Sequence, residues 1–164
     1  LYELSGNNDK EVAALQDSLS KNGTFTVSDD IKRKMGELFW AGCCDDEETL
    51  KTIGKYFGEY SYLADTHTAV ALNVYEQYIA ATGDDRPTVI ASTASPYKFA
   101  NSVLSAISER KGDSEFDTVK ILSEVSHTEI PEPLMALENA EVRFKEICEK
   151  DNMLSAVYSA LKIN

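Results

Sequence analysis

Residues 86–93, RPTVIAST, are the one stretch of the chain that predicts a β-strand, because the other periodic stretches predict helices. Val89 and Ile90 are β-branched, and Pro87 is tolerated only at the edge of a sheet, since it has no N–H to donate. A single strand cannot satisfy its own backbone N–H and C=O groups, so it must pair with another. We therefore expect either an isolated strand in a helical domain or part of a larger α/β protein whose sheet lies upstream.

The end of this strand is the expected place for a ligand. The apolar run of residues 88–91 is typical of a strand that is buried on both faces, and open α/β sheets bind their ligands beyond the carboxyl ends of such strands. Ser92 and Thr93 follow directly. The alternative interpretation is that their hydroxyl groups satisfy nearby backbone groups at the end of a strand.

The remaining stretches have apolar residues at helical spacing and residues that suit helix starts. Pro96 suits the first position of its helix. In the helix that ends at Gly83 we expect Val70, Val74 and Tyr78 to face the core. The residues expected to cap helices are Ser28, Asp45, Asp65 and Ser95. The expected helices cover residues 8–21, 28–42, 45–60, 65–83, 96–108, 114–126, 140–150 and 152–162.

Composition excludes several classes of function. The chain has 164 residues, 43% of them hydrophobic, which suits one globular domain. Its net charge, 16 − 28 = −12, argues against nucleic acid and anionic membranes as partners, because both bind through many cationic side chains. No apolar stretch approaches the roughly 20 residues of a membrane span. The chain begins at Leu1 without a methionine, so we expect a piece of a longer protein.

The cysteines and histidines indicate neither a disulfide framework nor a metal site. Cys43, Cys44 and Cys148 form no CxxC pair, and their odd number suits a cytoplasmic protein. His67 and His127 are far apart in the sequence, and we expect no bound metal.

Four stretches resemble the C-terminal part of threonine synthases, the pyridoxal-phosphate enzymes of fold type II that convert O-phosphohomoserine and water to threonine and phosphate. LYELSGN resembles the family's ERLLYELSG, and YLADTHTAVA resembles YLLDPHTAVA. ASTASPYKFANSVLSAI resembles xSTAHPxKFxxxVxxAL, and IPEPLMALENAEVRF resembles IPxPLxxLxxxxxRF. The four stretches follow one another in the family's order over roughly residues 1–147.

The resemblance implies a fold and a set of site residues. The fold is a mostly α fragment of an α/β fold, with one or two short strands that complete a sheet of the absent N-terminal part. Residues 1–164 form the C-terminal part of the enzyme, and residues 108–164 form a helical extension packed on it. Thr93, with Ser92 beside it, aligns with the hydroxyl that meets the cofactor's pyridine nitrogen. The helix start offers Asp65, His67 and Thr68, and together with Lys98 these are candidates for binding the substrate's phosphate and carboxylate. Each also has an alternative role. Asp65 would then be only an N-cap, and His67 and Lys98 would be solvated surface residues.

Two departures from the family affect this assignment. Thr66 replaces the proline that follows the aspartate, which removes a preset backbone angle but keeps the cap of Asp65. Ser95 replaces the histidine of TAHP and suits a helix cap, so any contact of that histidine with substrate has no counterpart here.

The family's covalent cofactor lysine, in PTxAFKD, and its phosphate loop, SGNxGD, do not occur among the 164 residues. The sequence thus predicts no catalytic residue in this part and an inactive isolated chain, whose partners are the missing N-terminal half and, through the exposed strand edge, a second copy. Two alternatives remain open: another pyridoxal-phosphate lyase of the same fold type, or a non-catalytic helical interaction module, which would expose a large apolar patch.

Overall fold

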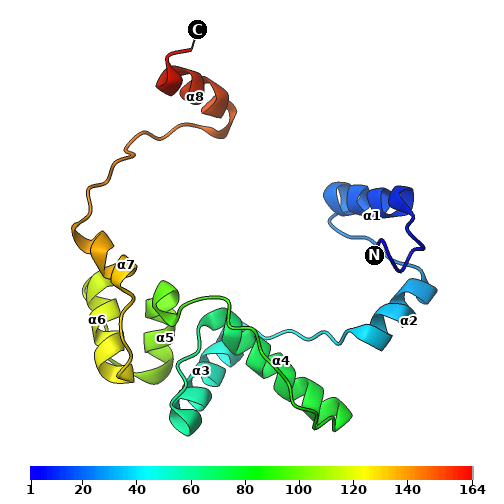
Figure 1. Cartoon of the computed structure of the whole chain (residues 1–164), viewed down its shortest axis with the longest axis horizontal. Coiled ribbons are helices and arrows are strands. Elements are labelled where there is room, and N and C mark those ends of the chain that lie inside the picture. Colours follow the sequence, from blue (N-terminus) through cyan, green and yellow to red (C-terminus); the bar gives the residue numbers. More distant parts are fainter. Residues whose placement is uncertain (164) are drawn as a thin grey trace.

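The computed structural model describes residues 1–163, which form helices joined by irregular segments, with no strand among them. Figure 1 shows α3 to α7 grouped together, with α1 and α2 beyond one side of the group and α8 at the end of a long connection. The α-helices are α1 (Asp9–Asn22), α2 (Asp29–Leu38), α3 (Asp46–Tyr60), α4 (Thr66–Thr82), α5 (Ala100–Ile107), α6 (Glu115–Ser126), α7 (Glu132–Met135) and α8 (Met153–Leu161). The 3-10 helices are η1 (Pro96–Phe99), η2 (Ala136–Asn139) and η3 (Lys150–Asn152).

The helices begin where short polar side chains accept backbone hydrogen bonds. The predicted caps Ser28, Asp45, Asp65 and Ser95 are confirmed, because each accepts an N–H from the first turn of its helix. Gly83 ends α4 with φ 67°, a left-handed conformation that glycine adopts without steric cost.

The hydrophobic core lies among α3, α4, α5 and α6. α3 packs against both α4 and α5, and α5 packs against α6. Ile53, Val103 and Leu122 are fully buried, and Leu104 is almost so. These helices carry most of the buried apolar side chains. All the regular elements of the described residues are helices, so the prediction of a mostly helical chain is confirmed.

The predicted strand at residues 87–92 does not form in the structure. The segment after α4 has no backbone hydrogen bond to another segment, and the side chain of Val89 is 96% exposed. A strand exists only as one member of a ladder, and residues 1–163 offer this segment no second member. The segment instead returns from the end of α4 toward its start (Figure 1).

Two helix predictions also need correction. No helix forms over residues 140–149, where Phe144 and Ile147 are 86% and 97% exposed, because a short helix needs an apolar face buried against a neighbour. α2 ends at Leu38 rather than at Gly42. Farther along the chain, the prolines of IPEP stand at the start of α7, with Pro131 as its N-cap.

The buried face of α4 also differs from the prediction. Its buried residues are Thr68, Ala69 and Leu72, whereas Val70, Val74 and Tyr78 are only half-buried. None of the helices within residues 1–163 combines the length and the apolar character that crossing a bilayer requires.

Two glycines one turn apart in α3 test the packing of this core. A Cβ at Gly54 would lie 2.9 Å from the carbonyl oxygen of Ala106, whereas a Cβ at Gly58 would meet nothing within 4 Å. We expect Gly58→Ala to raise the free energy of unfolding by about 0.5–1 kcal/mol, because alanine favours a helix. We expect Gly54→Ala to lower it by about 1–3 kcal/mol, because α3 and α5 must separate. Urea unfolding followed by circular dichroism measures both, and equal effects would contradict the close α3–α5 contact.

Candidate functional site

A buried carboxylate organises the start of α4. Asp65 is 1% exposed, and its Oδ1 accepts N–H hydrogen bonds from His67 at 2.8 Å and Thr68 at 3.2 Å. Its Oδ2 accepts the hydroxyl proton of Thr68. Leu63 and Ala64 are buried just before it, so the chain enters α4 through the core and carries the carboxylate with it. The positive end of the helix and these charge-assisted hydrogen bonds stabilise the buried charge.

Thr68 connects this helix start to the stretch ASTASPYKFANSVLSAI. Its Oγ1 lies 3.1 Å from the Oγ of Ser92 and forms a hydrogen bond with it, across 24 positions of sequence. Ser92 and Thr93 are both exposed. The Thr93 hydroxyl has no hydrogen-bond partner within residues 1–163, whereas that of Ser92 is engaged by Thr68.

Two further anchors hold the chain on either side of Ser92. Near the end of α4, the Asp84 carboxylate accepts hydrogen bonds from Arg86 Nε at 2.8 Å and from the Tyr78 hydroxyl at 2.5 Å, which together hold the pKa of Asp84 well below its usual range. On the other side, the hydroxyl of Tyr97 donates to the Thr128 carbonyl at 2.8 Å, and Tyr97 is only 5% exposed. The segment between these anchors therefore has fixed ends.

His67 and Lys98, both exposed, meet at the ring of Phe99. The His67 ring stands edge-on to Phe99 with 5.0 Å between ring centroids, and the Lys98 Nζ lies 5.5 Å from the centroid of the same ring. Phe99 also packs against the core, and the sequence pattern did not indicate its contact with His67 and Lys98. Phe99 is half-buried. The one sequence signal for its position near the candidate residues is that it directly follows Lys98 in the KF pair of the motif.

The predicted site residues thus fall into two linked groups. Asp65, Thr68 and Ser92 form one hydrogen-bonded chain, and His67 and Lys98 share the Phe99 ring. The first-turn N–H groups of His67 and Thr68 are already bonded to Asp65, so they are not available to an anion. An anionic ligand at this surface would have to rely on the exposed side chains.

The residues present fit one part of pyridoxal phosphate. The exposed, unengaged hydroxyl of Thr93 can donate to, or accept from, a pyridine nitrogen, and no carboxylate lies among the hydrogen-bond partners of Ser92 or Thr93. A phosphate loop and a covalent lysine are not among the motifs of these residues. The fit therefore extends to the nitrogen end of the ring only.

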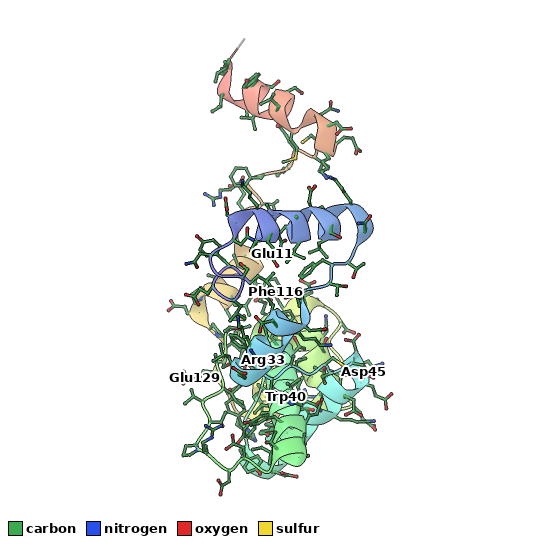
Figure 2. All side chains as sticks on the ribbon, turned by 90° about the vertical axis from the view of Figure 1, so that its right-hand side faces the viewer. Glu11, Arg33, Trp40, Asp45, Phe116 and Glu129 are labelled. Atoms are coloured by element: carbon green, nitrogen blue, oxygen red, sulfur yellow. The ribbon has the colours of Figure 1, made fainter. Side chains whose placement is uncertain are left out.

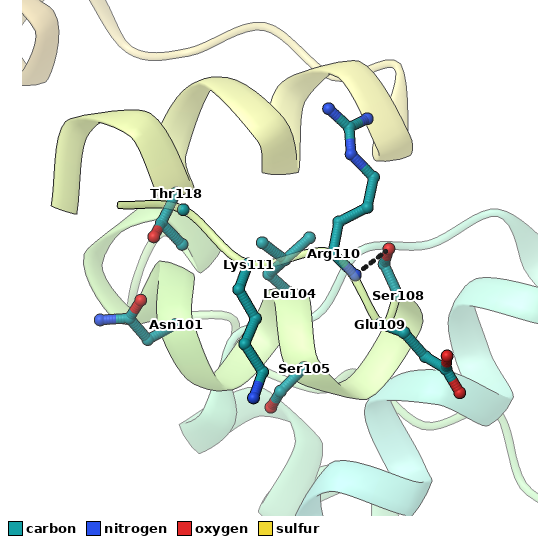
Figure 3. Close-up of a pocket in the computed structure, with 9 residues that line it drawn as sticks. Asn101, Leu104, Ser105, Ser108, Glu109, Arg110, Lys111 and Thr118 are labelled. Atoms are coloured by element: carbon teal, nitrogen blue, oxygen red, sulfur yellow. Dashed lines mark hydrogen bonds between the residues drawn. The ribbon is translucent and has the colours of Figure 1, made fainter. Parts of the chain in front are cut away.

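A groove also lies away from these residues. It has a volume of about 610 Å³ and lies between α5, α6 and the loop after α5 (Figure 3). Lys111 and Thr118 line it, while Arg110 forms an ion pair with Glu124 at 2.8 Å. A second groove, of about 390 Å³, includes Lys98 in its wall. No group of three potential metal ligands occurs within residues 1–163.

The chain is similar to threonine synthases. The family model described as "Threonine synthase, C-terminal" matches residues 68–159. A threonine synthase of Saccharomyces cerevisiae is 32% identical over 138 residues, 81% of this chain and 25% of the relative. One from Pseudomonas aeruginosa is 31% identical over 103 residues, 63% of this chain and 22% of the relative. The chain therefore spans about a quarter or less of these curated relatives.

The fold resembles one solved structure in particular. The crystal structure of pyridoxal-phosphate-bound threonine synthase from Brucella melitensis superimposes with a TM-score of 0.60 at 24% identity, covering 77% of this chain and 30% of that chain. At this identity the likeness concerns the fold alone.

Two aspartate caps provide a test of the buried carboxylate. Asp45 caps α3 through one N–H hydrogen bond at 2.8 Å and is exposed, whereas Asp65 is buried and accepts three hydrogen bonds. We expect Asp45→Ala to cost about 1 kcal/mol of unfolding free energy. We expect Asp65→Ala to cost about 3 kcal/mol, because buried donors are left unpaired. Urea unfolding of the two variants measures the difference, and similar costs would contradict the network around Asp65.

Proposed function

Because the chain belongs to the threonine synthase family, within its C-terminal domain, we propose that it supplies the late part of an enzyme that converts O-phosphohomoserine and water to threonine and phosphate. The observation that carries the proposal is the hydrogen bond between Thr68 and Ser92, since it joins the two family motifs beside the unengaged hydroxyl of Thr93. Whole relatives are much longer than the matched part, so the reaction belongs to a longer assembly.

In this proposal Thr93 contacts the pyridine nitrogen of pyridoxal phosphate, and Ser92 lies beside it. When bound, the cofactor supplies an electron sink for the carbons of the substrate. A neutral hydroxyl stabilises a protonated ring less than a carboxylate does, which suits elimination and replacement chemistry. The absence of any carboxylate from the hydrogen bonds of these two residues supports this role.

The substrate carries a phosphate and a carboxylate, and we assign its recognition to the surface around Phe99. Lys98 is exposed and cationic, so it can pair with an anionic group, and His67 is exposed on the other side of the same ring. Asp65 and Thr68 contribute to the substrate site by fixing the first turn of α4, from which His67 projects.

The proposal also covers the location of the protein, its C-terminal extension and its self-association. A cytoplasmic location suits the three cysteines, none of which forms a disulfide. Residues 108–164 are proposed as a C-terminal extension, and the packing of α6 on α5 supports this for its first half. A second copy of the chain at residues 87–92 stays a prediction.

The alternative of a non-catalytic helical interaction module predicts exposed apolar side chains, and the chain has them. α8 stands clear of the other helices, and its side chains extend into open space (Figures 1 and 2). Leu154 and Leu161 are 64% and 63% exposed. The relatives are about four times longer than the matched part, so the family assignment leaves room for these residues to be covered by another part of the whole protein. The family match therefore favours the enzyme, and it also disfavours a different pyridoxal-phosphate lyase.

The 164-residue polypeptide by itself should neither bind pyridoxal phosphate covalently nor release phosphate from O-phosphohomoserine, because it lacks the two required motifs. Its absorbance after incubation with the cofactor and dialysis is the measurement. A stable band at about 410–420 nm, characteristic of the covalently bound cofactor, would contradict this expectation.

In the full-length gene product, Thr93→Val should reduce turnover by about 5- to 150-fold. The reason is that an unpaired ring nitrogen in a closed site raises the activation free energy by about 1–3 kcal/mol. Valine keeps the volume and the β-branched shape, so folding should be retained. Phosphate release from O-phosphohomoserine is the assay.

Thr88→Val is the matched control, since Thr88 lies in the same segment and its hydroxyl bonds only to the carbonyl of Arg86. Its turnover should stay within about twofold of the unaltered product, less than the effect of a lost hydrogen bond. Ser92→Ala should cost less than Thr93→Val. Full turnover of Thr93→Val together with loss of activity in Ser92→Ala would move the assignment to Ser92.

A further inference from the structure

The hydroxyl of Thr68 links a buried carboxylate to an exposed hydroxyl. Thr68 Oγ1 donates toward Asp65 Oδ2, and it is also the donor toward Ser92 Oγ, at 3.1 Å. Its single proton therefore faces two acceptors, and Thr68 is the centre of a hydrogen-bonded chain that joins Asp65 to Ser92.

Burial protects the inner part of this chain. Asp65 and Thr68 are 1% and 3% exposed, so water has little access to the hydrogen bond between them. The other carboxylate oxygen is held by two N–H groups of α4, and the carboxylate cannot rotate without losing them. Thr68 is therefore a fixed point to which the exposed Ser92 is attached.

The Thr68–Ser92 hydrogen bond is also the sole tether of its segment. Among the described residues, positions 87–94 make no other side-chain hydrogen bond to a helix and no backbone hydrogen bond at all. The nearest anchors are those at Asp84 and Tyr97. Without the tether, Ser92 and Thr93 would have only the half-buried side chain of Ile90 to hold them against the core.

We propose that Thr68 is a positioning residue: its hydrogen bond to Ser92, supported by the buried Asp65, holds the Ser92–Thr93 segment where Thr93 can contact the ring nitrogen of the cofactor. This inference rests on the function proposed above, because that function supplies the ring.

A double-mutant cycle in the 164-residue chain tests the tether without any cofactor. Thr68→Val, Ser92→Ala and the double variant are compared with the unaltered chain by urea unfolding. Ser92→Ala should lower the folding equilibrium constant by about threefold or more in the unaltered chain and should have no effect beside Thr68→Val. Because Ser92 is exposed, its variant folds even if Thr68→Val is strongly destabilised. Additive effects would overturn the hydrogen bond itself.

The affinity of the full-length gene product for the cofactor tests the positioning role of Thr68. The dissociation constant of pyridoxal phosphate, measured by absorbance titration, should rise about tenfold in Thr68→Val, as expected when a tether worth one hydrogen bond is lost. Thr68→Ser keeps the hydroxyl and should restore the affinity to within about twofold of the unaltered product.

Thr49→Val is the matched control for a general loss of stability. Thr49 is 6% exposed and donates to the carbonyl of its own capping residue, Asp45, at 2.7 Å, but it does not contact Ser92. The affinity of the Thr49→Val variant for the cofactor should be unchanged. Unchanged affinity in Thr68→Val, or equal losses in Thr68→Val and Thr49→Val, would overturn the positioning role and leave the proposed function intact. If the unaltered product binds no cofactor, the proposed function and the positioning role fall together, while the cycle still reports the tether.

Discussion

The buried carboxylate of Asp65 is the group on which the arrangement of the motif residues depends. A charge at this depth is stable only because both oxygens accept hydrogen bonds and the positive end of α4 faces them. These bonds determine where α4 starts, and the start of α4 determines that His67 projects outward and Thr68 inward. The contact with Ser92 and the one with Phe99 both follow from this single helix start.

Local chemistry was predictable from the sequence, and the caps are the clearest case. Ser28, Asp45, Asp65 and Ser95 were identified because a helix cap involves residues only two or three positions apart. The buried side of α4 was not identified, since its apolar residues occur on several faces and the spacing alone does not select one. Ala69 and Leu72 belong to the buried core cluster, and α4 joins that core by packing against α3.

Contacts between distant residues were the part that the sequence could not predict. The Thr68–Ser92 hydrogen bond spans 24 positions, and no periodicity connects them. The strand at 87–92 and the helix at 140–150 were predicted from local preference, but each would need a partner surface that residues 1–163 do not offer. The two motifs were nevertheless both identified, because the family resemblance contains the outcome of such distant contacts.

The order of the core helices has a consequence for folding kinetics. α3 contacts α4 and α5, and α5 contacts α6, so nearly all the burial joins elements that are neighbours or next neighbours in the chain. Chains with such local contacts fold in microseconds to milliseconds, faster than chains that must first pair distant strands. Thr68 lies at the start of α4 and Ser92 in the segment that follows this helix, so their hydrogen bond joins an element of the core to the segment next to it in the chain. The surface that carries Thr93 would then be in place before a sheet from any other part of the protein is assembled.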